Sequence, residues 1–197
     1  LLSTQANTES AESAAALRDA GSRVGVIARV YDRLHGLSTL DDVSIVAVIG
    51  GLVDELRSSL LPDDVVVEIE VAEINVAARL AVSLGIIVNE LITNAVKYAF
   101  PAARGKISVT ARGTDRSGNS GGGDTASGLD LVVTDSGGGF PADVLSGERL
   151  GYGLTIAQAL VAQHEGTIAL RNAEGGVVEI HIPLSAGPLA AGRSAQR

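Results

Sequence analysis

The stretch that decides the fold reads Asn89-Glu90-Leu91-Ile92-Thr93-Asn94-Ala95-Val96-Lys97-Tyr98. On a helix that turns about 100° per residue, its polar side chains share an arc of roughly 140°: Asn89, Glu90, Thr93, Asn94 and Lys97. This arc holds carboxylate, amide and ammonium groups, which suit a divalent cation that carries phosphates. The same pattern is also typical of an amphipathic surface helix, and this stretch alone leaves both interpretations open.

The composition indicates a folded domain with an aliphatic core. The chain has 197 residues, 46% of them hydrophobic but only 3% aromatic, so Val, Ile, Leu and Ala must build the core. This length suits one good-sized domain with an appendage, or two small domains. A net charge of −8 argues against a nucleic-acid partner. Cysteine is absent, which excludes disulfides and thiolate metal sites, fits a reducing compartment and favours a cytoplasmic location.

No targeting or anchoring segment is visible in the sequence. The longest apolar run, Ala81 to Val88, is shorter than a membrane span and includes Ser83 and Gly85. The N-terminus lacks a basic region followed by an apolar block, so no signal peptide is expected. The chain begins with Leu1 and contains no methionine. We interpret it as an internal piece of a longer protein or a processed chain.

The N-terminal part is predicted to be helical. Apolar residues between 10 and 34 recur at spacings of three and four, which is typical of a helical bundle or a packed helix. His35-Gly36 ends this helix, the glycine serving as its C-cap. Residues 1–38 are therefore predicted to be a helical bundle segment that precedes the main domain.

Residues 39–184 are predicted to form an α/β domain, and residues 185–197 a disordered tail. A capping box from Thr39 to Asp42 opens a helix that runs to about Leu60. The helix with the polar arc ends before Pro101, and a Gly/Ser-rich hairpin loop spans residues 114–127. The other predicted elements are strands at Val65–Val71, Lys106–Thr110, Leu129–Thr134, Thr167–Arg171 and Val177–Pro183, with a helix at Leu154–His164. This order predicts a two-layer α/β sandwich with a largely antiparallel sheet.

A first glycine cluster, Asp135-Ser136-Gly137-Gly138-Gly139, follows an apolar strand. Glycines let a ligand approach the backbone closely, while the carboxylate accepts a hydrogen bond, for example from the exocyclic amine of adenine. A simple β-turn with three glycines remains the alternative.

A second cluster, Gly151-Tyr152-Gly153-Leu154, precedes a predicted helix. Free backbone N–H groups at a helix N-terminus form an anion site. No Gly-Lys-Ser/Thr follows, so this is not a Walker A loop, and no G-x-G-x-x-G opens a βαβ unit.

These three stretches, in this order and spacing, resemble the ATP-binding domain of the histidine kinase, gyrase B and Hsp90 superfamily, called the GHKL or Bergerat fold. Asn89 to Tyr98 is similar to its N box, and looks most like that of sensor histidine kinases. Asp135 to Gly139 and Gly151 to Leu154 are similar to its two glycine boxes. The resemblance covers roughly residues 41–184.

The resemblance implies a role for each matching residue. Asn94 would give its side-chain oxygen to Mg²⁺, and Glu90 would hold the metal's water or assist proton transfer. Lys97 would meet the phosphates of ATP, and Asp135 would accept from the adenine amine. The remaining nucleotide-binding positions would be Tyr98, Gly137, Gly139, Gly151, Gly153 and Leu154. Residues Phe140 to Leu150 would form the lid over the nucleotide.

Two features depart from the family pattern. The lid is short, and Val177 follows Gly175-Gly176 where the family usually has a threonine. A hydroxyl lost near the adenine would weaken a water-mediated contact.

The implied activity is transfer of the ATP γ-phosphoryl group to a histidine, in a homodimer held by the N-terminal helices. A response regulator or phosphotransfer protein would be the partner. Of the three histidines, His164 is predicted to be structural and His181 to point to solvent or a loop. The sequence around His35 does not resemble an acceptor box. We therefore expect the acceptor to lie outside this chain. The alternatives are an anti-sigma serine kinase, and a phosphotransferase or scaffold of the same fold that no longer binds ATP.

Overall fold

The computed structural model describes residues 42–100, 104–115 and 126–184, together with residues 21 and 25. Apart from Gly21 and Gly25, which are helical, the predicted helix over residues 10–34 lies outside the described residues. So do His35, most of the proposed capping box and the predicted tail 185–197.

A five-stranded sheet forms one layer of the fold. Its strands run in the order β2 (Val65–Val71), β4 (Gly105–Thr114), β5 (Gly128–Asp135), β7 (Gly176–Pro183) and β6 (Thr167–Asn172). Strands β2 and β4 are parallel and the other pairs are antiparallel, which confirms the prediction of a largely antiparallel sheet. Strands β4 and β5 pair directly, so the Gly/Ser-rich segment connects a hairpin as predicted.

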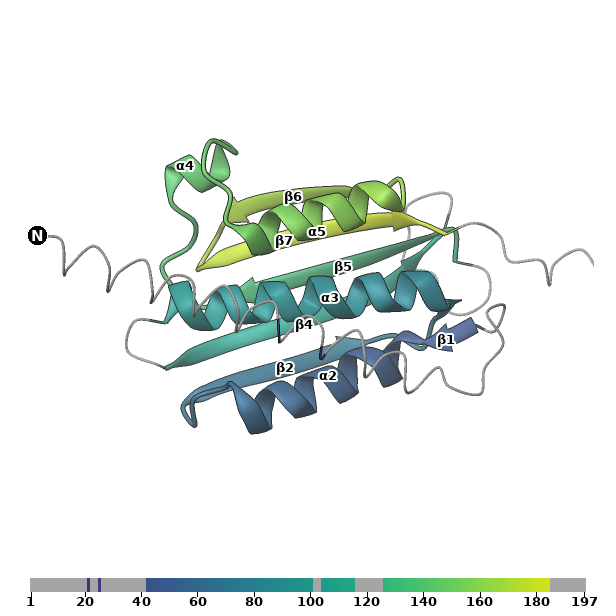
Figure 1. The fold of residues 1–197 in the computed structure, drawn as a ribbon, viewed down its shortest axis with the longest axis horizontal. Coiled ribbons are helices and arrows are strands. Elements are labelled where there is room, and N and C mark those ends of the chain that lie inside the picture. The colour runs from purple at the N-terminus through teal and green to yellow at the C-terminus, as the bar shows by residue number, and fades with distance from the viewer. Residues whose placement is uncertain (1–20, 22–24, 26–41, 101–103, 116–125, 185–197) are drawn as a thin grey trace, which may run out of the picture.

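Three helices form the second layer, on one face of the sheet: α2 (Ile45–Ser59), α3 (Ala78–Asn94) and α5 (Tyr152–Gln163) (Figure 1). Each strand turns alternate side chains toward them, as in β4, where Ile107, Val109 and Ala111 are buried. Helix α2 turns an apolar stripe inward at spacings of three and four residues: Ile45, Val48, Ile49, Leu52, Val53 and Leu56. The predicted two-layer α/β fold is confirmed.

Helix α3 lies at the centre of the helical layer. Together with the turn that follows it, over Ala78–Ala99, it is long and apolar enough to cross a membrane, with a mean hydropathy of 1.4 in an 18-residue window. However, 72% of that window is buried inside the domain, as expected of a core helix in a globular protein. The helix widens into one π-helical turn at Ala95–Ala99 and ends at Phe100.

The start of α2 corrects one prediction. The helix begins at Ile45, because Asp42–Ser44 forms a short strand, β1, that pairs with β3 (Asn75–Ala77). The Ile45 N–H also donates to the carbonyl of Ile74 at 3.0 Å. Pairing with a distant segment therefore overrides the local capping pattern. Strands of three residues are too short to show an alternating pattern, so the sequence predicted neither β1 nor β3.

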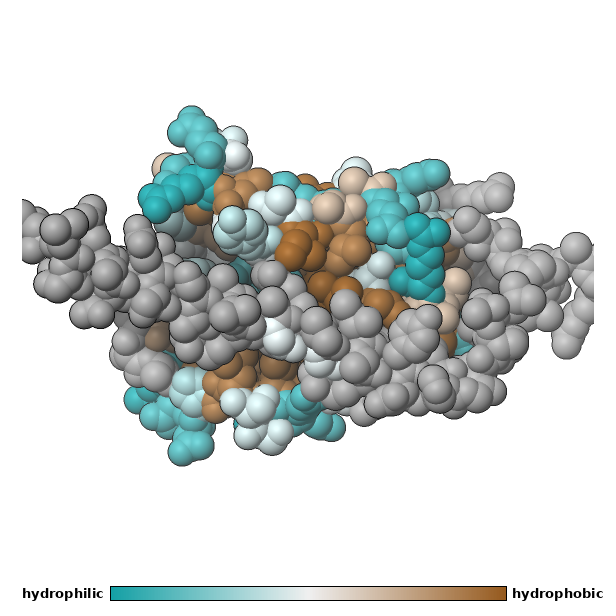
Figure 2. Space-filling view, viewed as in Figure 1, coloured by the Kyte–Doolittle hydropathy of each residue, from teal (hydrophilic) through white to brown (hydrophobic). Residues whose placement is uncertain are grey.

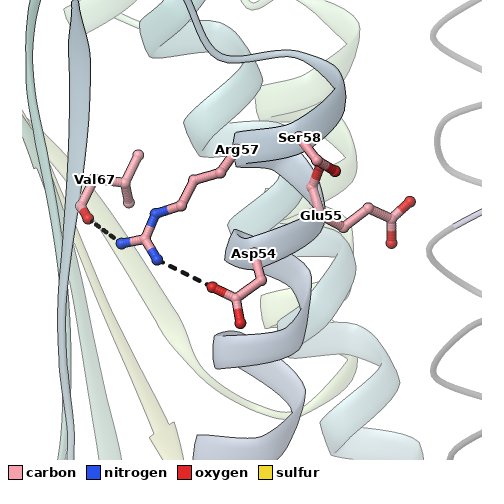
Figure 3. Close-up of polar contacts among 5 residues, drawn as sticks. All are labelled: Asp54, Glu55, Arg57, Ser58 and Val67. Atoms are coloured by element: carbon pink, nitrogen blue, oxygen red, sulfur yellow. Dashed lines mark hydrogen bonds and ion pairs between the residues drawn. The ribbon is translucent and has the colours of Figure 1, made fainter. Parts of the chain in front are cut away.

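Arg57 ties the end of α2 to the edge strand β2. Its guanidinium donates to the carbonyl of Val67 at 2.6 Å and to the carboxylate of Asp54 at 3.0 Å (Figure 3). The side-chain hydroxyl of Ser58 also donates to the backbone carbonyl of Glu55 at 2.8 Å, within the last turn of the helix. The bond to Val67 occupies a carbonyl in a strand at the edge of the sheet.

The two outer faces of the domain differ in character. On the sheet side, cross-strand ion pairs join Lys106 to Glu68 at 2.8 Å and Arg112 to Glu70 at 2.7 Å. On the helical side, apolar surface gathers over α5 and the adjoining part of α3 (Figure 2). The candidate site described next lies where the ends of these two helices meet the sheet.

Candidate functional site

The C-terminal half of α3 is buried rather than exposed. Asn89 and Glu90 retain only 2% and 5% of their accessible surface, although both are polar. Thr93 and Asn94 are half-buried, and only Lys97 and the following tyrosine reach solvent. The interpretation of this stretch as an amphipathic surface helix is therefore wrong, because α3 packs between α2 and α5. A buried carboxylate needs a compensating environment.

The N-terminus of α5 lies against this polar part of α3. A Cβ atom at position 153 would stand 2.6 Å from Oε2 of Glu90 and 3.0 Å from Nδ2 of Asn94. The second glycine cluster and the polar arc, some sixty residues apart in sequence, are thus in direct contact. Gly153 is required here because any side chain would fill the space beside these two groups.

Among the described residues, no side chain caps the first turn of α5. Gly151 occupies the N-cap position and has no side chain to bond the first N–H groups, and the first turn has no acidic residue. A Cβ at position 151 would meet nothing within 4 Å. Uncapped N–H groups and the helix dipole favour an anion at this end. Leu154 is buried and holds this turn to the core.

Asp135 ends strand β5 and organises a second part of the site. One carboxylate oxygen, Oδ1, accepts from the N–H of Gly137 at 2.8 Å and from the N–H of Gly176 at 3.2 Å. The other oxygen, Oδ2, would lie 2.5 Å from a Cβ at position 176. The carboxylate therefore joins the turn after β5 to the turn before β7.

Gly175 and Gly176 are site residues to which the sequence analysis gave no role. A Cβ at position 175 would collide with the backbone carbonyl of Asp135, and one at position 176 with its carboxylate. Both glycines are buried. A pair of glycines at the tip of a predicted hairpin, close to a carboxylate motif, is the signal that could have found them.

Contacts within the protein leave no room for a side chain at Gly137 or Gly139. A Cβ at position 137 would collide with the backbone of Ala99, at the end of the π-helical turn. Gly139 has a φ of +76°, a conformation that favours glycine, and faces the side chain of Asn172. Packing against Ala99 and Asn172 thus accounts for both glycines. That they also let the adenine base approach the backbone closely stays a prediction.

The predicted lid contains one short helix, α4 (Ala142–Leu145). Within the lid, the N–H of Arg149 donates to the carbonyl of Asp143 at 3.0 Å, and their side chains form an ion pair at 3.9 Å. Gly147 has a φ of +78° and lets the segment turn back toward α5. Tyr98 and Tyr152 are highly exposed, at 81% and 85%.

Neither described histidine lies in this constellation. His164 ends α5, and its Nε2 lies 2.9 Å from the hydroxyl of buried Ser83. Burial lowers the pKa of His164 below its usual value of 6.5, and the nearby Arg79 guanidinium lowers it further. His181 is exposed, as predicted, and its Nδ1 lies 2.6 Å from the carboxylate of Asp130. The contact with Ser83 agrees with a structural role for His164.

Comparisons with known proteins place this chain in a family. Residues 80–186 match the family model described as histidine kinase-, DNA gyrase B-, and HSP90-like ATPase, and residues 1–60 match one described as histidine kinase. The chain belongs to the histidine kinase-, DNA gyrase B- and HSP90-like ATPase family, as its sequence motifs predicted.

Individual relatives are sensor kinases. The chain is 31% identical over 189 residues to sensor histidine kinase PdtaS of Mycobacterium tuberculosis; the match covers 93% of this chain but only 36% of PdtaS. The chain thus spans about a third of the length of this curated relative. Two solved structures share its fold. They are the histidine kinase domain of a blue-light activated kinase from Erythrobacter litoralis (TM-score 0.71, 21% identity, 84% of this chain and 75% of that chain) and the mycobacterial sensor histidine kinase MprB (0.55, 22%, 73% and 97%).

Proposed function

We propose that this chain is the ATP-binding catalytic part of a two-component sensor histidine kinase, which transfers the γ-phosphoryl group of ATP to a histidine. The observation that carries the proposal is the contact of Gly153 with Glu90 and Asn94 at the uncapped N-terminus of α5. A carboxylate, an amide and free N–H groups are thereby brought to one place. Phosphoryl transfer needs this kind of positioning and charge neutralisation.

Glu90 and Asn94 fit a magnesium ion bound through phosphates. The described residues contain no cluster of three or more His, Cys, Asp or Glu side chains that could hold a metal alone. Magnesium usually keeps several waters and takes only one or two protein ligands beside the substrate phosphates. In this role Asn94 supplies an amide oxygen and Glu90 a carboxylate. Bound Mg²⁺ would neutralise charge on the phosphate oxygens.

The remaining residues of the motifs would bind the nucleotide. Lys97 and Tyr98 are exposed and follow Asn94 on the π-helical turn. Lys97 would meet the phosphates, and Tyr98 would contribute to the same nucleotide site. The N–H groups after Gly151 would cradle the phosphates. The second oxygen of Asp135 would accept from the amine of adenine, since Oδ1 already accepts two backbone N–H groups.

The wider assignments rest on the family. We propose a homodimer through residues 1–38, a catalytic domain at 39–184, a tail from 185, a response regulator or phosphotransfer protein as partner, and a cytoplasmic location. The match of residues 1–60 to a histidine kinase model supports the N-terminal assignment. The phosphoacceptor is proposed to lie outside this chain, since neither described histidine lies beside Glu90 or Asn94 and the sequence around His35 does not resemble an acceptor box.

A thermal melt with and without Mg-ATP tests the proposal. A ligand that binds only the folded state, at about 100 times its dissociation constant, adds roughly 2.7 kcal/mol of stability. We expect this shift in the wild type and its loss in Asn94→Ala. The control is Asn75→Ala, an exposed asparagine in β3 that should leave the shift intact. Absence of any shift in the wild type would refute ATP binding.

The assignment of Asp135 has its own test, in the variant Asp135→Asn. An amide keeps an oxygen for the N–H groups of Gly137 and Gly176, but it replaces the second acceptor with a donor. Affinity for ATP should therefore fall at least about tenfold, whereas affinity for GTP, whose base carries a carbonyl in place of this amine, should not fall. An equal loss for both nucleotides would show that the variant had damaged the turn and not base recognition.

A further inference from the structure

Asn172, the last residue of β6, holds the backbone of Phe140 from both sides. The Phe140 N–H donates to Oδ1 of Asn172 at 2.7 Å, and Nδ2 of Asn172 donates to the Phe140 carbonyl at 2.9 Å. The two residues are 32 positions apart in sequence. Because the amide uses its acceptor and its donor on one residue, it fixes both the place and the direction of the chain there.

Gly139 is shaped for this amide. A Cβ at position 139 would lie 2.7 Å from both Cγ and Oδ1 of Asn172, and the glycine has a φ of +76°. A side chain here would meet both the amide and a conformation that L residues rarely adopt. The third glycine of the motif thus makes room for Asn172 and turns the N–H of Phe140 toward it.

Phe140, the residue that Asn172 anchors, lies next to the proposed nucleotide site. The ring of Phe140 borders Gly176, since a Cβ at position 176 would stand 3.0 Å from the ring and 2.5 Å from Oδ2 of Asp135. Phe140 is also the first residue of the predicted lid, Phe140 to Leu150. The Asn172 amide therefore fixes the backbone of the first residue of the predicted lid, and the ring of that residue lies on the same side of Gly176 as the Asp135 carboxylate.

We propose that Asn172 is a positioning residue that anchors the fixed end of the lid to the β6–β7 hairpin. The anchor holds the Phe140 ring beside Asp135 before nucleotide arrives, so that binding does not have to order this end of the lid. This inference rests on the proposed function, because it assigns Asn172 to the same nucleotide site. Preorganisation of this kind raises affinity by increasing the population of the competent state.

Two variants separate the halves of the anchor. Asn172→Ala removes both hydrogen bonds, whereas Asn172→Asp keeps an acceptor for the Phe140 N–H and loses the donor to its carbonyl. Asn172 lies at the surface, so neither change disturbs the core. The control is Glu174→Ala, an exposed residue in the same hairpin. Unliganded melting temperatures show that each variant is folded.

Hydrogen exchange and proteolysis measure the anchor without nucleotide. The Phe140 amide should exchange at least about tenfold faster in Asn172→Ala than in wild type, and less so in Asn172→Asp. Arg149 is the one trypsin site between residues 140 and 150, and cleavage after it should accelerate in the same order. Unchanged exchange and cleavage in Asn172→Ala would overturn the anchor.

Binding of Mg-ATP measures its consequence. If the competent state falls to about one tenth of the population, the dissociation constant rises about tenfold in Asn172→Ala and stays at the wild-type value in Glu174→Ala. Wild-type affinity in Asn172→Ala, with faster exchange, would overturn the positioning role and leave the proposed function standing. Failure of the wild type itself to bind would instead overturn the proposed function, and the positioning role with it.

Discussion

Two polar contacts between helices α3 and α5, one near each end of their junction, are built in opposite ways. Near the start of α3, buried Ser83 and His164 form a hydrogen-bond contact of 2.9 Å that closes the junction within the protein. Near its end, Glu90 and Asn94 face Gly153, which has no side chain to cover them. The same pair of helices thus makes a sealed junction for stability at one end and a junction suited to a ligand at the other.

The largest effect, on Mg-ATP affinity, is expected for Gly153→Ala, which places a side chain over the proposed ligand end of the junction. The new Cβ would stand 2.6 Å from Oε2 of Glu90, so the carboxylate must swing away and Asn94 must shift with it. We expect Mg-ATP affinity to fall by more than about tenfold, because both proposed metal ligands are displaced. Isothermal titration with Mg-ATP measures this loss.

The stability of Gly153→Ala separates this effect from unfolding. Alanine favours a helix by about 1 kcal/mol over glycine, and a flexible carboxylate gives way more readily than backbone does. The variant should therefore unfold within about 1 kcal/mol of the wild type. Gly50→Ala in α2, where a Cβ meets nothing within 4 Å, is the matched control and should bind normally. Normal binding in Gly153→Ala would contradict the ligand role of this junction.

The residues of the proposed ligand end could be identified from the sequence, and the contact at the sealed end could not. Asp135, Asn94 and Gly153 stand in ordered motifs whose chemistry is visible in their residue types. The contact between Ser83 and His164 spans 81 positions and has no local pattern. Pairings of this kind depend on how two helices pack and not on either helix alone.

The same reason explains the other misses. Asn172 and Gly176 act through contacts with a turn more than thirty residues earlier in the chain. The burial of Asn89 was not expected, because helical periodicity shows which residues share a side but not what that side packs against. The π-helical turn at Ala95–Ala99 also breaks the assumed 3.6-residue period before Lys97 and Tyr98.

A smaller effect, on the free energy of unfolding, is expected for Ser83→Ala, which removes the hydrogen-bond contact at the sealed end. The change removes a buried hydroxyl that contacts His164 and donates to the carbonyl of Arg79 at 3.1 Å. Loss of such a bond costs about 1–2 kcal/mol of unfolding free energy, measured by urea denaturation. Ser58→Ala removes a comparable bond at the exposed end of α2 and should cost less. Mg-ATP affinity should not change, and a clear loss would show that the two junctions are coupled.

The smallest expected effect is the pH dependence of the sealed end. The pKa of His164 is lowered in the folded state, first by burial and second by Arg79. Between this lowered pKa and the usual value of 6.5, the unfolded chain binds the proton and the folded chain does not. Stability from His164 is therefore fully present above pH 6.5 and is lost as the pH falls through the folded pKa.

Urea denaturation between pH 7.5 and about 5.5 tests this sign. The wild type should lose more stability on acidification than His164→Gln, because the variant has no proton to bind at this position. Arg79→Gln should reduce the difference only in part, since burial of the imidazole is the larger cause of the lowered pKa. If the unfolding free energies of wild type and His164→Gln fell equally with pH, His164 would bind its proton equally well in the folded and unfolded states. The contact with Ser83 would then not depend on a neutral imidazole.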